Sequence, residues 1–159
     1  MKILILGGTV FLGPHVIDAA LSVGHSVAVF NRGTKPFPTF MGIEQFIGDR
    51  THDADLLQLS DRYWDVVIDT CGYEPTIVEK SAQFFRERTS KYVFISSISA
   101  IENFREAGIT ESANLKQLPD SGPGDYGQLK AACEKVVQLY SEYSVLIIRP
   151  GLIVGPLDP

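Results

Sequence analysis

Short apolar runs alternate with longer amphipathic stretches along this chain, and the alternation predicts its secondary structure. Several of the apolar runs are almost continuously hydrophobic, which is typical of strands buried on both faces of a sheet. We predict six strands, at residues 2–6, 26–30, 44–47, 64–69, 91–95 and 144–148. We predict helices at residues 12–24, 53–61, 75–88 and 125–143. Strands that alternate with helices predict an α/β fold with a doubly wound parallel sheet and right-handed crossovers.

Two stretches of the chain follow neither the strand nor the helix pattern of hydrophobic residues. Residues 33–42 contain several Gly and Pro residues, which predict a surface loop. Residues 96–124 have little apolar periodicity, and a loop of that length within a compact domain is usually functional or mobile.

Composition narrows the class of protein. The chain has 159 residues, of which 45% are hydrophobic and 21% are charged, so we assign residues 1–159 to one globular domain. Its net charge of −5 argues against a general nucleic-acid binder, which would normally carry a basic surface. The first apolar run, residues 3–6, is too short for a signal peptide or a membrane span. We therefore expect a cytoplasmic protein without a membrane partner.

The cysteines and histidines indicate no metal site or disulfide scaffold. Cys71 and Cys133 form no Cys-x-x-Cys pair, and we interpret both as buried residues. The three histidines show no spacing that is typical of metal ligands, namely His15, His25 and His52. We therefore predict no metal.

A glycine-rich turn joins the first predicted strand to the first predicted helix. Its sequence is Gly7-Gly8-Thr9-Val10-Phe11-Leu12-Gly13. In a dinucleotide-binding turn, glycine permits the tight bend, the helix N-terminus faces the pyrophosphate, and the last glycine lets the helix pack closely on the strand. Val10 occupies the place of the second glycine of G-x-G-x-x-G, where a Cβ atom hinders approach of the backbone to phosphate. The alternative interpretation is an ordinary strand–helix turn with incidental glycines.

The end of the second predicted strand bears on the choice of cofactor. A carboxylate about 20 residues beyond the glycines normally accepts the ribose 2′-hydroxyl of NAD. Here Asn31 stands at that place and Arg32 follows it. Without the carboxylate, a 2′-phosphate is not repelled, and a guanidinium can bind it with two hydrogen bonds. We therefore expect NADP or NAD, with NADP favoured; alternatively, Arg32 is a solvated loop residue.

The last predicted helix carries a tyrosine and a lysine one turn apart. Tyr126 and Lys130 lie on nearly the same side of that helix. An ammonium at this place favours tyrosinate, so that a phenol with a pKa of about 10 can act as a base near neutral pH. The spacing alone also fits a helix-face tyrosine beside a solvated lysine. We predict one packed face, formed by Tyr126, Leu129, Cys133, Val136 and Tyr140.

Serines at the end of the fifth predicted strand strengthen the functional interpretation. Ser96 and Ser97 follow that strand directly, and ligands of open α/β sheets bind at the carboxyl ends of the strands. Their hydroxyls can bind a substrate oxygen, although the pattern of either serine alone favours a loop or capping residue. Together with Tyr126 and Lys130 they form a three-part pattern.

With these residues the chain resembles the extended or atypical short-chain dehydrogenases/reductases, the NAD(P)-dependent epimerase/dehydratase superfamily. The resemblance covers nearly the whole chain and implies a Rossmann fold with strand order 3-2-1-4-5-6. It rests on the glycine-rich turn, Gly48-Asp49-Arg50, Asp69-Thr70-Cys71-Gly72-Tyr73, Ser96-Ser97, Tyr126 to Lys130, and Arg149-Pro150-Gly151.

The resemblance also implies roles for individual residues. Ser97 orients the substrate oxygen, Tyr126 is the acid/base, and Lys130 binds the nicotinamide ribose and lowers the tyrosine pKa. Further cofactor contacts are implied around the adenine (Asp49, Arg50), the ribose and phosphate (Thr70, Cys71, Gly72), and the nicotinamide (Pro150, Gly151), with Ser96 beside Ser97.

The predicted function is NAD(P)-dependent oxidoreductase, epimerase or dehydratase chemistry on a sugar nucleotide or another small hydroxy or carbonyl compound. The alternative is a non-catalytic dinucleotide-binding protein, or a relative of the chloroplast RNA-binding proteins of the same superfamily. Val10 favours that alternative, as does the apparent absence of the C-terminal substrate domain that extended members carry. Apolar surface meant for that domain would favour self-association, so a homo-oligomer is a further expectation.

Overall fold

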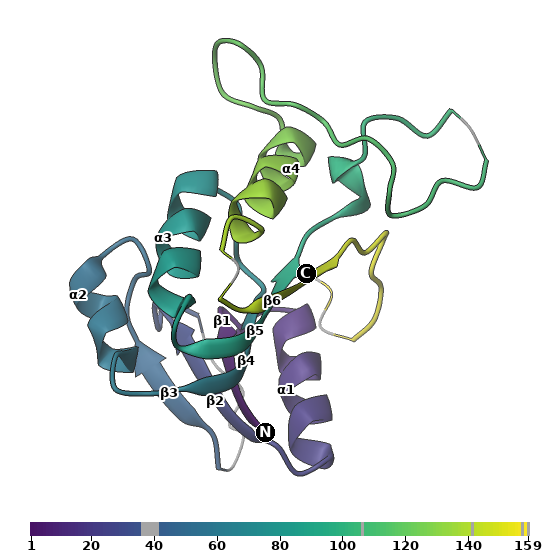
Figure 1. Ribbon diagram of the computed structural model, residues 1–159. Helices are drawn as coiled ribbons and strands as arrows, with labels where there is room; N and C mark the ends of the chain where they lie inside the picture. The colour runs from purple at the N-terminus through teal and green to yellow at the C-terminus, as the bar shows by residue number, and fades with distance from the viewer. Residues whose placement is uncertain (36–41, 106, 141, 157, 159) are drawn as a thin grey trace.

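The fold is described from a computed structural model covering residues 1–35, 42–105, 107–140, 142–156 and 158. Six parallel strands form one sheet in the order β3-β2-β1-β4-β5-β6. Figure 1 shows this sheet between helix α1 on one side and helices α2 and α3 on the other. The strands are β1 (Lys2–Leu6), β2 (Ser26–Asn31), β3 (Glu44–Ile47), β4 (Trp64–Asp69), β5 (Thr89–Ile95) and β6 (Ser144–Ile148). The predicted fold class and strand order are therefore confirmed.

The helices are shorter than the sequence pattern predicted. They are α1 (Leu12–Ser22), α2 (Asp53–Leu56), α3 (Pro75–Phe85) and α4 (Tyr126–Val137), with 3-10 turns η1 (Leu57–Leu59) and η2 (Ile98–Ala100). Helix α1 ends early because Gly24 adopts a φ of 80°, and the N–H groups of Gly24 and His25 bond back to the carbonyls of Leu21 and Ala20. These two bonds form a Schellman cap, which stops the helix.

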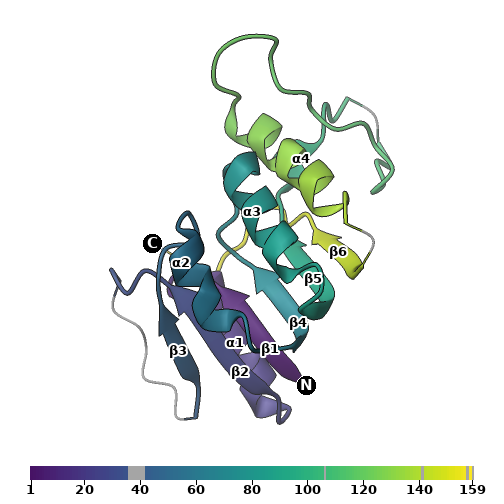
Figure 2. The ribbon, with the colours of Figure 1, turned by 60° about the vertical axis from the view of Figure 1, so that its left-hand side comes forward.

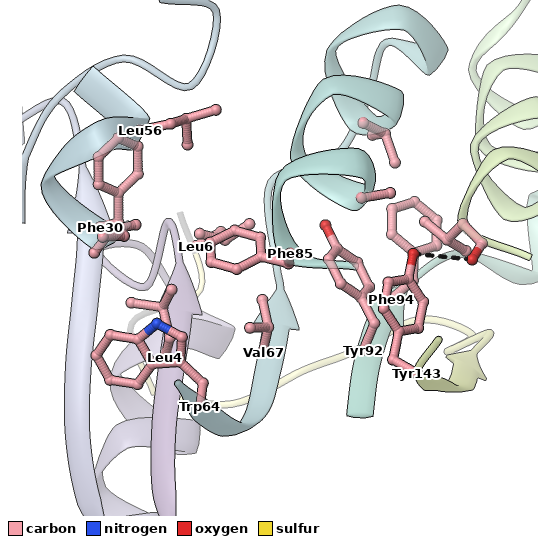
Figure 3. Close-up of a cluster of buried hydrophobic side chains, with 14 of the residues drawn as sticks. Leu4, Leu6, Phe30, Leu56, Trp64, Val67, Phe85, Tyr92, Phe94 and Tyr143 are labelled. Atoms are coloured by element: carbon pink, nitrogen blue, oxygen red, sulfur yellow. Dashed lines mark hydrogen bonds between the residues drawn. The ribbon is translucent and has the colours of Figure 1, made fainter. Parts of the chain in front are cut away.

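Helices cover the two faces of the sheet unequally, as the turned view in Figure 2 shows. Helices α2, α3 and α4 pack on one face through Leu56, Phe85 and Val137 respectively. The larger core cluster lies between these helices and the sheet, and Figure 3 shows its aromatic and aliphatic side chains. Helix α1 covers the other face, where Ile17 and Ala20 pack against residues of β1 and β2.

The segment between β5 and α4 is irregular, as predicted. Beyond η2, a single antiparallel bridge pairs Ile101 with Leu115. Figure 1 shows this segment reaching out beyond the sheet and the start of α4. The other predicted loop, residues 33–42, falls mostly on 36–41, which lie outside the described residues.

Neither a membrane span nor a metal cluster is found among the residues that the structure describes. No described helix is long and apolar enough to cross a membrane. No group of three or more His, Cys, Asp or Glu side chains in the described ranges is arranged to hold a metal ion.

Candidate active site

The glycine-rich turn lies at the carboxyl end of β1 and has the backbone geometry that its sequence indicates. Gly7 and Gly8 adopt φ angles of 93° and 79°, a region that side chains disfavour. Gly7 N–H donates to the carbonyl of Phe30 at 2.9 Å. A Cβ atom on Gly13 would lie 2.4 Å from the Gly8 backbone, so only glycine lets α1 start this close to β1.

The start of α1 has features that suit an anion. Its N-cap residue, Phe11, makes no side-chain cap, and the first turn holds no acidic residue. The first N–H groups of a helix have no partner within the helix, and the helix dipole favours negative charge there. Val10 is 51% exposed, so its side chain does not pack into the interior beneath this turn. The residues present therefore fit a pyrophosphate group.

Asn31, the last residue of β2, is held by hydrogen bonds within the protein, whereas Arg32, which follows it, is exposed. The buried Asn31 amide oxygen accepts from Gly33 N–H at 3.0 Å and from the Gln45 amide at 3.1 Å. Its amide nitrogen donates to the Gly7 carbonyl at 3.4 Å, so this side chain ties the glycine turn to β2 and β3. Arg32 is exposed. Among the described residues it forms no ion pair, which leaves its guanidinium available to a ligand.

Asp49 follows β3 at the same end of the sheet. Its carboxylate accepts from the backbone N–H and the hydroxyl of Thr51, at 2.9 and 2.8 Å. These hydrogen bonds lower the pKa of Asp49, and the nearby His52 and Arg32 lower it further. The carboxylate therefore lies near Arg32, where the adenine end of a dinucleotide was predicted.

Arg50 is buried, and its place beside the cofactor stays a prediction. Its guanidinium is buried and pairs with both carboxylate oxygens of Asp69, at 2.8 and 2.6 Å. Its Nε donates to Ser81 of α3 at 2.9 Å, and the Tyr92 hydroxyl donates to Asp69 at 2.9 Å. Burial alone would raise the pKa of Asp69, but the Arg50 charge and these bonds hold it below its ordinary value. The Arg50 side chain therefore joins α3 to β4, and its Nη1 also lies 3.5 Å from the Cys71 sulfur.

The residues after β4 support both the glycine turn and Lys130. The Thr70 hydroxyl donates to the Leu6 carbonyl at 2.8 Å and accepts from Gly8 N–H at 3.2 Å. Burial raises the pKa of the Cys71 thiol to about 11, so it stays protonated at neutral pH. A Cβ atom on Gly72 would lie 2.5 Å from the Phe94 ring, so glycine is required there.

Helix α4 places Tyr126 and Lys130 at this end of the sheet. It starts with a capping box, in which the Asp125 carboxylate accepts from Gln128 N–H at 2.8 Å and the Gln128 side chain accepts from Asp125 N–H at 2.7 Å. A Cβ atom on Gly127 would lie 2.0 Å from the Ser99 carbonyl oxygen, so the first turn packs directly on η2. Tyr126 is 51% exposed, whereas Lys130 is 2% exposed.

The Lys130 ammonium is held by backbone carbonyls from two neighbouring strand ends. Its Nζ donates to Gly72 at 2.8 Å and to Ile95 at 2.6 Å. Burial lowers the pKa of Lys130, and the negative charge of Asp69 opposes that effect. Lys130 is thus a buried cation in a fixed position, one helical turn from Tyr126.

The two predicted serines face different surroundings. Ser97 caps η2, and its hydroxyl oxygen accepts from Ser99 N–H at 3.1 Å, which leaves the hydroxyl proton available. Ser96 is buried, and its hydroxyl donates to the Glu134 carboxylate of α4. The Ser96 side chain therefore points toward α4, and its predicted place beside Ser97 among the cofactor contacts stays a prediction.

The buried Glu134 forms an ion pair with the partly buried Arg149, which the sequence pattern did not predict. Arg149 Nε and Nη2 donate to the Glu134 carboxylate at 2.9 and 2.7 Å, and Nη1 donates to the Glu111 carbonyl at 2.8 Å. The pair links α4 to the ends of β5 and β6, which precede Ser97 and Pro150. The sequence held one indication of this pair, because Glu134 lies one helical turn after Lys130 and Arg149 directly follows a predicted strand.

An open pocket of about 380 Å³ adjoins these residues. Ile98, Ile101, Phe104 and Ile109 give it apolar walls, and Arg149 and Glu111 also line it. Ile98 N–H donates to the Pro150 carbonyl at 3.0 Å, and a Cβ atom on Gly151 would lie 3.7 Å from the Ile98 side chain, so both residues adjoin a wall of this pocket.

Comparison with known proteins places the chain in a family. The chain belongs to the NAD dependent epimerase/dehydratase family, whose model matches residues 3–159. The resemblance inferred from the sequence motifs is thereby confirmed. A comparison with curated protein sequences gives no match.

Solved structures share the fold at low sequence identity. The enzyme WbmG of Bordetella bronchiseptica, solved in complex with NAD, is 20% identical with a TM-score of 0.75, over 94% of this chain and 52% of that one. The UDP-glucuronic acid 4-epimerase of Bacillus cereus, also with NAD, is 20% identical with a TM-score of 0.76, over 99% and 59%. The UDP-Glc/GlcNAc 4-epimerase of Campylobacter jejuni is 16% identical with a TM-score of 0.79, over 93% and 52%. This chain thus spans somewhat more than half the length of these proteins.

Proposed function

We propose that the chain binds a nicotinamide dinucleotide along the carboxyl edge of its sheet and uses Tyr126 as the acid/base of an epimerase, dehydratase or oxidoreductase. One observation carries the proposal: the glycine turn, Ser97 and the Tyr126–Lys130 pair all gather at that edge. Family membership and the NAD-bound neighbours support the same cofactor class.

The cofactor would lie across the strand ends in an extended form. The turn at residues 7–13 and the start of α1 would hold the pyrophosphate, and Asp49 would hold the adenine end. Thr70, Cys71 and Gly72 would line the ribose and phosphate. Pro150 and Gly151 would border the nicotinamide, beside the pocket at Arg149.

NADP is favoured over NAD because of the end of β2. No carboxylate stands at the position that normally accepts the ribose 2′-hydroxyl, since the Asn31 side chain is occupied by Gly33, Gln45 and Gly7. The Arg32 guanidinium is exposed next to it and can bind a 2′-phosphate.

The side chains at the sheet edge can move one proton and hold one substrate oxygen. The nicotinamide ring, when bound, would supply the hydride acceptor or donor. The Ser97 hydroxyl would bind the substrate oxygen, and Tyr126 would take the proton from a substrate hydroxyl or return it to a carbonyl. The fixed charge of Lys130 would stabilise the resulting phenolate. Sugar nucleotides and other small hydroxy or carbonyl compounds are the proposed substrates.

Titration calorimetry of the chain with NADP⁺ and with NAD⁺ tests the proposal. We expect saturable binding of both, with the tighter binding for NADP⁺. Tighter binding of NAD⁺ would contradict the NADP preference, and no binding of either would contradict the proposed function. The second candidate, a non-catalytic dinucleotide-binding protein, would bind cofactor without Tyr126-dependent turnover.

A further inference from the structure

Tyr73 is a half-exposed aromatic residue that the proposed site does not yet use. It directly follows Gly72, whose carbonyl accepts a hydrogen bond from Lys130. Its ring centroid lies 5.2 Å from Lys130 Nζ and 6.4 Å from the centroid of the Tyr126 ring, with 40° between the two ring planes. Tyr73 therefore contacts both members of the proposed acid–base pair.

Lys130 Nζ lies over two aromatic rings. The second is Phe94 of β5, whose centroid is 4.4 Å from the nitrogen. An ammonium over the face of an aromatic ring is stabilised in its charged form, most strongly where water is excluded. Phe94 is buried in the core, whereas the Tyr73 side chain covers the ammonium from the surface.

The other titratable groups that act on Lys130 come from two elements. Asp69 and Cys71 lie at and after the end of β4, and Cys133 and Glu134 lie on α4. Burial opposes the charged ammonium and the carboxylates of Asp69 and Glu134 favour it, whereas the two thiols stay protonated at neutral pH and add no charge. Tyr126 lies one turn before Lys130 on α4. Replacing Tyr73 changes none of these groups and removes one aromatic face only.

We propose that Tyr73 is a positioning residue of the acid–base site: the face of its ring holds the Lys130 ammonium in place and charged, beside Tyr126. The inference rests on the proposed function for its catalytic meaning. The ring rather than the hydroxyl makes these contacts, because the Tyr73 hydroxyl has no hydrogen-bond partner among the residues that the structure describes. Phenylalanine should therefore replace Tyr73, and leucine should not.

Lysine NMR separates this role from a merely structural one. The ¹³Cε signal of Lys130, assigned with Lys130→Met, reports the protonation of its amine in ¹³C-lysine-labelled protein. We expect Tyr73→Phe to titrate like the wild type. We expect Tyr73→Leu, which keeps an apolar cover but lacks the ring, to titrate about half a pH unit lower. Equal midpoints for Tyr73→Phe and Tyr73→Leu would overturn the proposal.

A matched control tests whether any loss of an exposed ring has this effect. Tyr63 is exposed to 55%, against 53% for Tyr73, and its hydroxyl bonds to Ser90 at the far end of the strands. We expect Tyr63→Leu to leave the Lys130 titration unchanged. A shift as large as that of Tyr73→Leu would overturn the proposal.

Cofactor affinity provides a second readout in the same variants. If Lys130 binds the nicotinamide ribose, a displaced ammonium should weaken NADPH binding by about threefold in Tyr73→Leu and not in Tyr73→Phe. If the wild type binds no dinucleotide, the proposed function is wrong, while the NMR comparison still decides whether the Tyr73 ring holds Lys130.

Discussion

Arg32 directly follows β2 and is exposed, at the place where we propose that a 2′-phosphate would lie. We predict that Arg32→Ala weakens NADP⁺ binding by roughly 30-fold, about 2 kcal/mol, because a charge-assisted contact to phosphate is lost. NAD⁺ binding should change little, since NAD⁺ has no phosphate there. Titration calorimetry with both cofactors measures the two effects.

Lys91 supplies the matched control for this prediction. It is an exposed cation near the amino end of β5, away from the proposed cofactor edge. Lys91→Ala should leave both affinities unchanged. An equal loss for NADP⁺ and NAD⁺ in Arg32→Ala would show that Arg32 does not distinguish the two cofactors.

Val10 argues against a dinucleotide-binding turn more strongly in the sequence than it does in the structure. A valine in the glycine pattern predicts a Cβ atom that obstructs phosphate. In the structure the Val10 side chain is half exposed, and its carbonyl accepts the Gly13 N–H at 3.1 Å. The direction of a side chain in a turn depends on backbone angles such as the φ of 43° at Phe11, which the spacing of residues does not specify.

At the scale of elements, the buried pair of Arg50 and Asp69 joins β4 to α3. We predict that Arg50→Met lowers the free energy of unfolding by about 3–5 kcal/mol, because it leaves the Asp69 charge buried without a partner. Urea denaturation measures this loss. Arg62→Met removes an arginine from an exposed pair with Glu44 and should cost about 1 kcal/mol or less.

The same pair predicts a pH dependence. Because folding lowers the pKa of Asp69, its contribution to stability is present above the unfolded value of about 3.9 and is lost as the pH falls through the folded value. In Arg50→Met, acid protonates the Asp69 carboxyl, and the neutral group no longer needs a cation beside it. The stability difference between wild type and variant should therefore shrink in acid. A difference that stays constant from pH 7 to pH 3 would contradict the role assigned to the pair.

The strands could be predicted from the sequence because buried parallel strands form continuous apolar runs, and all six are present. The packed face of α4 could not be predicted in full. The pattern predicted Tyr126 on that face, but Tyr126 is half exposed. Lys130 and Glu134 are buried instead, since carbonyls, serine and arginine from other elements satisfy their charges. The spacing of apolar residues does not predict a buried charged residue whose partners lie far away in the sequence.

In the candidate site too, local motifs could be predicted from the sequence, whereas contacts between distant residues could not. The glycine turn and Ser97 follow directly from motifs that are local in sequence. The buried contacts of Arg50 and Ser96 could not be predicted from the motifs in which these residues stand. Their inward partners, Asp69 and Glu134, lie 19 and 38 residues away along the chain. Tyr73 was part of a recognised motif, but its contact with Lys130 depends on the packing of α4.

At the scale of the whole molecule, the sheet is covered by three helices on one face and by α1 on the other (Figure 2). Leu146 and Ile148 of the edge strand β6 are exposed to 47% and 41%, and Leu152 beyond it to 93%. The pocket beside Arg149 is open, and Tyr126 faces solvent on one side. The 159-residue chain therefore holds the proposed chemical groups but encloses little space around a substrate.

We predict that this chain alone binds cofactor but turns over slowly. Good positioning of substrate can lower a barrier by roughly 7–11 kcal/mol, and an open pocket forgoes much of that gain. An assay of NADP-dependent oxidation and reduction over a panel of hydroxy and carbonyl compounds measures turnover. Brisk turnover that Tyr126→Phe abolishes would show that the chain is catalytically self-sufficient.

The central claim is that a nicotinamide dinucleotide lies along the carboxyl edge of the sheet. Amide hydrogen exchange with and without saturating NADP⁺, read by mass spectrometry, tests it most directly. The account predicts slower exchange at residues 7–13, 31–33 and 70–73. It predicts no change in α2 or in the first residues of β5. Unchanged exchange at residues 7–13, or protection confined to other segments, would contradict it.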